Sequence, residues 1–399
     1  MSDGTQFGAG FRLAASPWFR PVALIVFGCL FFIQGGILLS GIPKALQGNS
    51  DFKHLYTAGY MVRTGHGQQL YDHEATDRFQ VELIGPTGST PPFNHLSYEA
   101  LIFIPLSFFR YRVAYSLFLS LDLFLLAFVF VLLRRYAAAY GPLWKPIVHV
   151  PFLCFLPFAF ALIQGQDSFL LLTALVCSFV AMERKRDFLS GAILALGLFK
   201  FQFVLPIALL FALWKKWRVV AGFGSTALIL SFLSLEVTGY NSWKTYSIYL
   251  LSMSAQLTEV GRGMYGILPE RMANLRGLIS AMTGNFVPQT VLQATIALAS
   301  VLLVLWATRK SPSFTLAVAV SFLVSYHAYS YDEAILILPL VASASAFMAS
   351  SSPWRIASGG ILVVAPTALL LARLPFWLGS IPIAFFLAAV AGGAGQVEI

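Results

Sequence analysis

Charged side chains are scarce in this sequence, and their scarcity excludes most classes of protein. Asp, Glu, Lys and Arg together make up 11% of the 399 residues, whereas a soluble domain carries about 25% because its surface faces water. Hydrophobic residues reach 58%, and a disordered chain would not contain 36 phenylalanines. The composition therefore predicts a polytopic membrane protein that sits in a lipid bilayer.

Cysteine is almost missing, and the common phosphate-binding and nucleophile motifs are missing altogether. Cys29, Cys154 and Cys177 each lie inside an apolar run, which is typical of small buried hydrophobic residues rather than of a disulfide or a metal site. The sequence has neither a P-loop nor the strand-turn-helix motif of serine hydrolases. It also has no segment polar enough to form a separate soluble domain, so residues 1–399 are predicted to form one membrane-embedded domain.

The net charge of +9 does not indicate a nucleic-acid partner. A nucleic-acid binder gathers Lys and Arg on one patch with aromatic residues between them, whereas here they form short clusters between apolar runs. That spacing is typical of membrane proteins, which hold Lys and Arg on the cytoplasmic side. The clusters are Arg110/Arg112, Arg134/Arg135, Arg184–Arg186, Lys215–Arg218 and Arg309/Lys310.

Apolar runs long enough for membrane helices recur along the whole chain, since about 20 mostly apolar residues span a bilayer. They predict an all-α bundle of about 12 transmembrane helices, with both termini cytoplasmic. The long polar stretches 44–96 and 239–289 then form outer loops, which we expect to contain interfacial helices. The runs are 21–42, 97–109, 113–133, 146–164, 168–182, 188–213, 218–238, 290–308, 312–326, 334–349, 354–372 and 375–391.

Two of these runs leave two threadings open. Run 97–109 is short and contains Pro105, and run 188–213 is interrupted by Lys200 and Gln202. If both cross the membrane, Arg134/Arg135 and Arg184–Arg186 fall outside, against the charge rule. If both are re-entrant or broken, these clusters return to the inside, and such helices occur where the backbone lines a protein cavity.

The first outer loop opens with a dense string of polar residues that begins at Asp51. The string resembles the first-loop motif of glycosyltransferase family 87, a family of polytopic enzymes of the GT-C class. The residues that carry this resemblance are Asp51-Phe52, Tyr56, Ala58-Gly59, Gly65 and Leu70-Tyr71-Asp72, followed by Pro92-Phe93, Pro105-Leu106, Gly165 to Ser168, Gly191, Gly197, Lys200, Gln202, Tyr326-His327 and Tyr331-Asp332. Residues 94–100 depart from the family pattern, which usually has a Tyr-x-Tyr-Pro-Pro segment there, so substrate preference can differ from that of the better-known members.

The resemblance implies a function and a location. Members similar to this chain use polyprenyl-phosphate mannose, so the expectation is an inverting enzyme that moves a sugar, with mannose as the family's best-known cargo, from a polyprenyl-phosphate donor. The acceptor would be a hydroxyl of a lipid or glycan at the outer face of a bacterial inner membrane. Asp51 occupies the family's catalytic position, where one carboxylate takes the acceptor proton as its oxygen attacks.

The resemblance and the cost of buried charge together suggest the binding residues. An ionisable residue inside an apolar run is costly, so Lys200 is the candidate for the donor phosphate, because a cation there would stabilise the leaving group. His327 in the short outer loop 327–333 is a candidate for the phosphate or the sugar hydroxyls. The other donor or substrate contacts are predicted to be Gln166, Lys53, His54, Tyr56, Gln202 and Tyr331.

Neither a metal nor a cofactor is expected. Asp51, His54 and Asp72 do not have a tight metal-ligand spacing, and the first loop lacks an Asp-x-Asp pair. Asp167 precedes a helical run and is predicted to cap it. Asp122 lies in the middle of an apolar run, and there it must face protein or a cavity.

Two alternatives to this enzyme use the same class of lipid. A flippase or transporter of lipid-linked sugars would also have broken helices and intramembrane charges, but its site lies at the midplane, whereas the polar candidates here gather on one face. A ligase of lipid-linked glycans would differ in transferring a long glycan, so the size of the product separates it from a glycosyltransferase.

Overall fold

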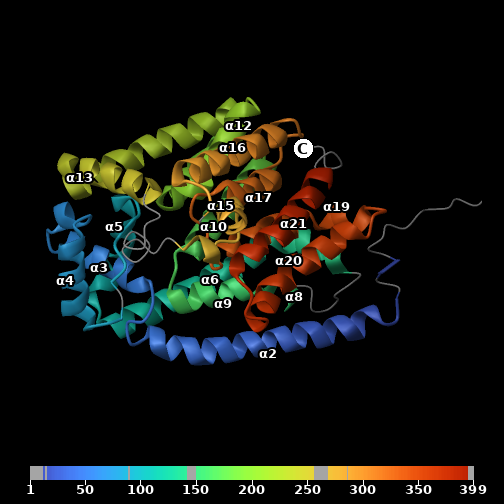
Figure 1. Cartoon of the computed structure of the whole chain (residues 1–399), viewed down its shortest axis with the longest axis horizontal. Coiled ribbons are helices and arrows are strands. Elements are labelled where there is room, and N and C mark those ends of the chain that lie inside the picture. The colour runs from blue at the N-terminus through green and yellow to red at the C-terminus, as the bar shows by residue number, and fades with distance from the viewer. Residues whose placement is uncertain are drawn as a thin grey trace, which may run out of the picture.

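The computed structural model describes residues 12–13, 16–88, 90–141, 150–255, 268–284 and 286–393, and these form helices joined by turns, with no strand among them. The prediction of an all-α membrane protein is confirmed. Most of the long helices run along one direction of the molecule (Figure 1). Among the described residues, six helical segments have the length and composition to cross a membrane, although one of them, Asp187–Leu213, folds back on itself. The six are Phe19–Ala45, Tyr111–Tyr140, Asp187–Leu213, Trp217–Ile248, Gln289–Thr308 and Trp354–Leu371. The count of about 12 stays a prediction.

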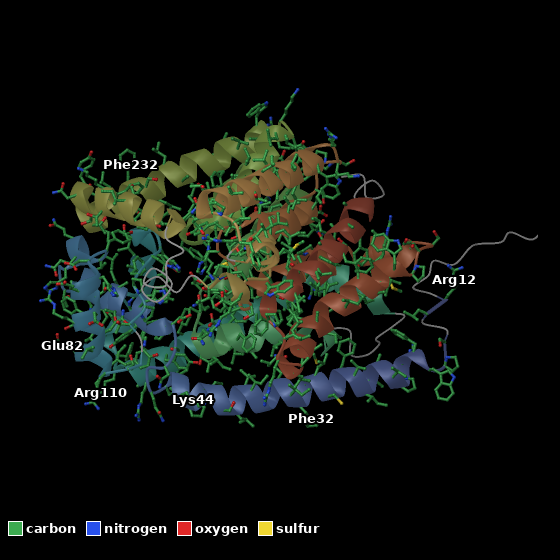
Figure 2. All side chains as sticks on the ribbon, in the orientation of Figure 1. Arg12, Phe32, Lys44, Glu82, Arg110 and Phe232 are labelled. Atoms are coloured by element: carbon green, nitrogen blue, oxygen red, sulfur yellow. The ribbon has the colours of Figure 1, made fainter. Side chains whose placement is uncertain are left out.

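Helix α2 (Phe19–Ala45) lies along one side of the molecule (Figure 1). Its apolar side chains are largely exposed. Phe32 on α2 is 78% exposed, and Phe232 on α13 (Trp217–Ala255) is 60% exposed. Figure 2 shows these two side chains on opposite sides of the molecule. Apolar surface of this kind is what a lipid environment requires of a spanning helix.

The first outer loop folds as a helical layer at the end of α2. Helices α3 (Phe52–Arg63) and α4 (His73–Ile84) lie there with the short turn η1 (Gly67–Gln69) between them (Figure 1). Asp72 caps α4, because its Oδ1 accepts hydrogen bonds from the backbone N–H groups of Glu74 and Ala75 at 3.0 and 3.2 Å. The prediction of helices in this loop is therefore correct.

Residues 97–109 do not cross the bundle. They form the short pieces η2 (Ser97–Glu99), α5 (Ala100–Phe103) and η3 (Leu106–Phe108), and α5 touches α3 so closely that a Cβ on Gly59 would lie 2.5 Å from the carbonyl carbon of Phe103. Helix α6 (Tyr111–Ala137), which runs on into η4 (Ala138–Tyr140), then starts at the same end, since the Tyr111 hydroxyl donates to the Ala45 carbonyl at 3.1 Å. Residues 97–109 thus begin and end at the same end of the bundle, the end where α2 finishes.

Residues 187–213 also turn back on themselves. They divide into α11 (Asp187–Ala195), η5 (Leu196–Lys200) and α12 (Phe201–Leu213), and the backbone leaves helical geometry at Lys200, with φ −109° and ψ 59°. A Cβ on Gly222 of α13 would lie 1.9 Å from the Phe188 carbonyl oxygen. The start of α11 therefore packs against the start of α13, and small residues permit this approach. Lys200 lies at the turn of the folded-back segment.

Most of the basic clusters lie at one end of the bundle, which we call the basic end. Arg135 on α6 lies 3.9 Å from Glu183, the last residue of α10 (Ser168–Glu183), so Arg134/Arg135 and Arg184–Arg186 are neighbours. The rings of Phe179 near the end of α10 and Phe211 near the end of α12 both contact Phe314, the first residue of α17 (Phe314–Val324). Lys215–Arg218 directly follow the end of α12, and Arg309/Lys310 lie just before the start of α17, so both clusters are at this same end. Of the two threadings, the folded-back one is therefore the observed one.

The cluster Arg110/Arg112 does not follow this pattern. Both residues lie at the start of α6, and Figure 2 shows Arg110 at the end occupied by α3 and α4, near Lys44 and Glu82. The prediction that all five clusters mark the same face is therefore wrong, because for Arg110/Arg112 it depended on run 97–109 crossing the membrane.

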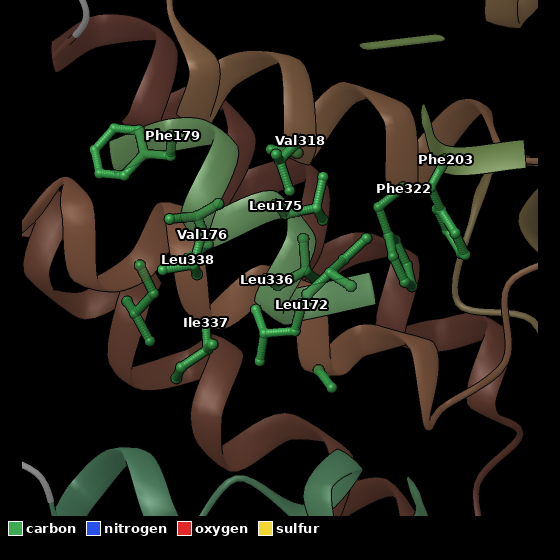
Figure 3. Close-up of a cluster of buried hydrophobic side chains, with 14 of the residues drawn as sticks. Leu172, Leu175, Val176, Phe179, Phe203, Val318, Phe322, Leu336, Ile337 and Leu338 are labelled. Carbon is green, nitrogen blue, oxygen red and sulfur yellow. The ribbon is translucent and has the colours of Figure 1, made fainter. Parts of the chain in front are cut away.

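A core of aliphatic and phenylalanine side chains holds the centre of the bundle together. Figure 3 shows Leu172 and Val176 of α10, Phe203 of α12, Phe322 of α17 and Leu336 of η7 (Asp332–Leu336) meeting in one cluster. Ser168 is the first residue of α10, Asp332 is the first residue of η7, and Lys200 directly precedes α12. The core therefore fixes the positions of three polar side chains that are far apart in the sequence.

The remaining described helices complete the bundle around this core. Predicted run 218–238 matches α13 up to Gly239, where φ is +75°, but the helix continues beyond this kink to Ala255, so the second outer loop begins as a helix. The other elements are α8 (Val150–Leu153), α9 (Leu156–Gln164), η6 (Pro269–Arg271), α15 (Leu275–Thr283), α16 (Gln289–Thr308), α18 (Ile337–Ala342), α19 (Ala344–Ala349), α20 (Trp354–Leu371), η8 (Phe376–Gly379) and α21 (Ser380–Gly393).

Candidate active site

Asp51 lies at the start of α3, directly after α2 has ended, and its carboxylate is held from a distant part of the chain. Its Oδ2 accepts a hydrogen bond of 2.7 Å from Nε2 of Gln166, and its backbone N–H donates to Oε1 of Gln164 at 3.2 Å. The side chain of Asp51 makes no cap of its own to α3. Both oxygens are therefore spared from helix capping, and one of them is oriented by Gln166.

Gly165 explains why Gln164 and Gln166 can both reach Asp51. It ends α9 in the left-handed conformation with φ +58°, and a Cβ at this position would lie 2.7 Å from Cβ of Phe52. Glycine meets both demands, since it adopts positive φ without strain and leaves room for Phe52. Gly165 and Gln166 thus end helix α9 in a way that brings the Gln166 side-chain amide within hydrogen-bond distance of the Asp51 carboxylate.

Burial and neighbouring groups adjust the basicity of Asp51. Burial raises the pKa of its carboxyl above the ordinary value, and the hydrogen bond from Gln166 and the charges of Lys53 and Lys200 lower it in part. A carboxylate with a raised pKa is a better proton acceptor, as long as it remains ionised at the working pH. Asp51 is therefore suited to the role of a general base.

Lys200 lies in a buried ionic cluster, where its ammonium already contacts protein groups instead of being available to bind a ligand. Its Nζ is 2.5 Å from Oδ1 of Asp332, 2.8 Å from Oδ1 of Asp167 and 3.0 Å from the Ser168 hydroxyl, and it lies 5.2 Å from the centre of the Tyr331 ring. The side chain is 3% exposed. Two carboxylates already balance its charge, so the geometry favours a structural role, and its assignment to the donor phosphate stays a prediction.

Asp167 does not cap α10, and that prediction is wrong. It occupies the position before the helix, but its side chain accepts no capping hydrogen bond from α10. The carboxylate turns instead toward Lys200 and toward His95, whose Nδ1 is 3.3 Å from Oδ2 of Asp167. The reason is electrostatic, because a buried lysine ammonium attracts the carboxylate more strongly than backbone N–H groups do.

His95 and Glu99 extend the cluster, and neither residue is among the predicted catalytic or binding residues. His95 Nδ1 lies 2.5 Å from Oε2 of Glu99. Burial, with the charge of Asp167 nearby, raises the pKa of Glu99 to about 8, although His95 lowers it in part. Burial would lower the pKa of His95, but Glu99 and Asp167 raise it above its ordinary value. The signal in the sequence that could have pointed to Glu99 is that an acidic residue lies inside the short apolar run 97–109.

His95, Glu99 and Asp167 also have the composition of a metal site. Each offers one ligand atom, and the three atoms lie within 4.8 Å of one another. A divalent ion would have to replace the His95–Glu99 contact and compete with the Lys200 ammonium for Asp167. The residues present thus satisfy one another, and the expectation that the site needs no metal remains a prediction.

His54 and His327 lie in the same region with ring nitrogens that no described residue satisfies. The His54 ring meets the His95 ring edge to face at 5.6 Å, and neither of its nitrogens has a hydrogen-bond partner among the described residues. The His327 ring meets that of Tyr329 at 4.5 Å, and its Nδ1 is likewise unsatisfied. Burial is the main cause that lowers the pKa of each histidine to about 3, so both rings are neutral. A neutral imidazole can donate a hydrogen bond to a substrate from one ring nitrogen and accept one at the other.

The other predicted residues are only partly brought together. Lys53 is buried and its Nζ donates to the Thr87 hydroxyl at 2.8 Å, and Tyr331 lies over Lys200. Gln202 is half-buried in the first turn of α12. The Tyr56 hydroxyl donates to the Phe109 carbonyl at 2.9 Å, and its ring meets that of Tyr111 at 5.6 Å, so this hydroxyl is already used within the protein.

The chain was compared with known families, curated proteins and solved structures. The model of glycosyltransferase family 87 matches residues 98–326, which is more than half of the chain. The chain belongs to glycosyltransferase family 87. No curated protein and no solved structure gives a match. The matched range includes Gln166, Asp167 and Lys200, which are among the residues that carry the resemblance, whereas Asp51 and the rest of the first-loop motif precede it.

Proposed function

We propose that this family 87 glycosyltransferase transfers a sugar from a polyprenyl-phosphate donor, with inversion, to a hydroxyl of a glycolipid or glycan. The observation that carries the proposal is Asp51, a half-buried carboxylate with a raised pKa, oriented by Gln166 at the N-terminal end of α3. The neutral rings of His54 and His327 support a role in holding sugar hydroxyls.

The step needs one base and one leaving group. The acceptor oxygen attacks the anomeric carbon while its proton passes to Asp51, and the bond from that carbon to the phosphate oxygen breaks. The phosphate departs with the electron pair as polyprenyl phosphate, so a single attack from the opposite face inverts the anomeric centre. Because phosphate is a good leaving group, the reaction does not need a second carboxyl group to protonate it.

The basic end supports a location for this reaction. Arg134/Arg135, Arg184–Arg186 and Lys215–Arg218 gather there, and Lys and Arg mark the cytoplasmic side of membrane proteins. Asp51 lies at the end where α3 and α4 form a layer (Figure 1). We therefore place the active site at the extracytoplasmic face of a bacterial inner membrane, with both termini on the cytoplasmic side.

The experiment is a transfer assay with the purified enzyme in lipid nanodiscs. Polyprenyl phosphates carrying radiolabelled mannose, other hexoses or pentoses are each offered with a membrane lipid extract as the source of acceptor. We expect transfer of a single sugar from at least one of these donors, with the opposite anomeric configuration in the product. Transfer from a nucleotide sugar alone would contradict the proposal, and transfer of a long glycan would favour the ligase alternative. Family membership favours either enzyme over a flippase.

Replacing Gln166 with leucine should move the acid limb of the pH–rate profile. The Gln166 hydrogen bond favours the ionised form of Asp51, so its loss raises the pKa of Asp51 further. Activity, which falls as the pH drops through that pKa, should then be lost at higher pH than in the wild type. The measurement is kcat/KM for sugar transfer between pH 4 and 8.

Gln164→Leu is the matched control for this prediction. Gln164 also contacts Asp51, but through the backbone N–H rather than the carboxylate, so its replacement should leave the position of the acid limb in place. An acid limb that moves to lower pH in Gln166→Leu, or equally in both variants, would refute the assignment of that limb to Asp51.

A further inference from the structure

Arg276 is a buried guanidinium with no carboxylate partner among the described residues. It is the second residue of α15 and is 5% exposed. Its Nη1 donates to the Tyr326 carbonyl at 3.0 Å, but its Nε has no hydrogen-bond partner among the described residues, and none of the ion pairs found there includes it. A buried charge without a counterion is costly, so the structure calls for an anion at this place.

Arg276 belongs to the surroundings of the active site through the loop 325–332. Asn274, the cap of α15, donates from Nδ2 to the Ser325 carbonyl at 2.7 Å, so two side chains of α15 hold this loop. The same loop presents His327, and its Tyr329 N–H donates to Oδ2 of Asp332 at 3.0 Å. Burial and the charge of Arg276 together lower the pKa of His327. The guanidinium is therefore a neighbour of a second buried group that has an unsatisfied nitrogen.

A purely structural role does not explain the charge. The hydrogen bond to the Tyr326 carbonyl could be made by a neutral amide, as Asn274 does with Ser325. Lys200, the cation that the sequence favoured for the phosphate, is already balanced by Asp167 and Asp332. Of Lys200 and Arg276, Arg276 is thus the cation whose positive charge a ligand could still neutralise.

We propose that Arg276 binds the phosphate of the polyprenyl-phosphate donor and of the polyprenyl phosphate that leaves. This inference rests on the proposed function. A guanidinium presents parallel N–H donors that match two phosphate oxygens, and its Nε edge is the part without a partner. As the bond between the sugar and the phosphate oxygen breaks, negative charge grows on that oxygen, and a cation fixed in a buried site stabilises it.

The test measures binding of farnesyl phosphate, a short prenyl phosphate, to the purified full-length enzyme by titration calorimetry. Farnesol serves as the uncharged probe, and a short-chain phosphatidylglycerol serves as a phosphate from another lipid. Arg276→Gln should weaken farnesyl phosphate binding about tenfold or more, as expected for charge-assisted hydrogen bonds, and leave farnesol binding unchanged. Arg276→Lys, which keeps the charge and loses the paired donors, should show a smaller loss. Exposed Arg78 on α4 provides the control Arg78→Gln, which should bind like the wild type.

Unchanged affinity for farnesyl phosphate in either Arg276 variant would overturn the inference. So would a wild-type protein that binds farnesol as tightly as farnesyl phosphate, or a loss in Arg276→Gln that is confined to phosphatidylglycerol. If Arg276→Gln fails to fold by circular dichroism and gel filtration, the Arg276→Lys comparison decides. Failure of the proposed function is a separate result, namely a wild-type enzyme that transfers no sugar from any polyprenyl-phosphate donor although farnesyl phosphate binds.

Discussion

Asp51→Asn is expected to abolish sugar transfer while leaving the protein folded. Asparagine cannot take the proton of the acceptor hydroxyl, and loss of a general base reduces kcat by about 10²- to 10⁴-fold. The amide oxygen of asparagine can still accept the hydrogen bond from Gln166, and Asp51 does not cap α3, so the local structure should persist. The measurement is kcat for transfer of radiolabelled sugar, together with the apparent melting temperature.

Asp77→Asn is the matched control for Asp51→Asn. Asp77 is a half-buried acid on α4 in the same outer layer, and it lies outside the cluster described above, so its replacement should leave kcat within about twofold of wild type, as for most surface substitutions. An Asp51→Asn enzyme that is folded and fully active would disprove the role of Asp51 as the base. The family assignment would stand, and another carboxylate would have to be sought.

Lys200→Met is expected to destabilise the protein strongly. Methionine has nearly the same shape, but its insertion leaves Asp167 and Asp332 buried without the ammonium that lies 2.8 and 2.5 Å from their oxygens. Removal of one partner from a buried ion pair costs about 3–5 kcal/mol. The apparent melting temperature in detergent and the yield of monodisperse protein should both fall.

A second substitution tests the cause of that loss. Lys200→Met combined with Asp332→Asn removes one of the orphaned charges, so the double variant should be more stable than Lys200→Met alone, although each single change is destabilising. Two losses that simply add would show that the ion pair is not coupled. A stable Lys200→Met enzyme that only binds donor more weakly would instead support the assignment of Lys200 to the donor phosphate.

Local properties of the sequence predicted most of the architecture. Runs 21–42, 113–133, 290–308 and 354–372 correspond to α2, α6, α16 and α20, with ends that differ by a few residues. Their prediction succeeds because the length of an apolar stretch is set by the bilayer and is visible residue by residue. The same reasoning left two threadings open for runs 97–109 and 188–213. Whether such a run crosses or turns back depends on close contacts such as Gly59 with Phe103, which a hydropathy pattern does not contain.

The candidate site was predicted in part, and the missing part has a physical reason. Asp51, Gln166 and Lys200 were singled out because each belongs to a motif or interrupts an apolar run. Glu99 and Arg276 were missed because each is a single charged residue without a spacing signal. Their significance comes from burial, 0% exposed for Glu99 and 5% for Arg276.

Scarcity of charge determined, from the sequence alone, that this chain belongs in a membrane and that each buried charge needs an explanation. Only the tertiary structure decided which buried charges form ion pairs with one another. Lys200 meets Asp167 and Asp332 across 33 and 132 residues, whereas Arg276 finds no carboxylate among the described residues. The reason is that electrostatic energy depends on distance in space and on burial, and neither of these quantities is a property of neighbours in the chain.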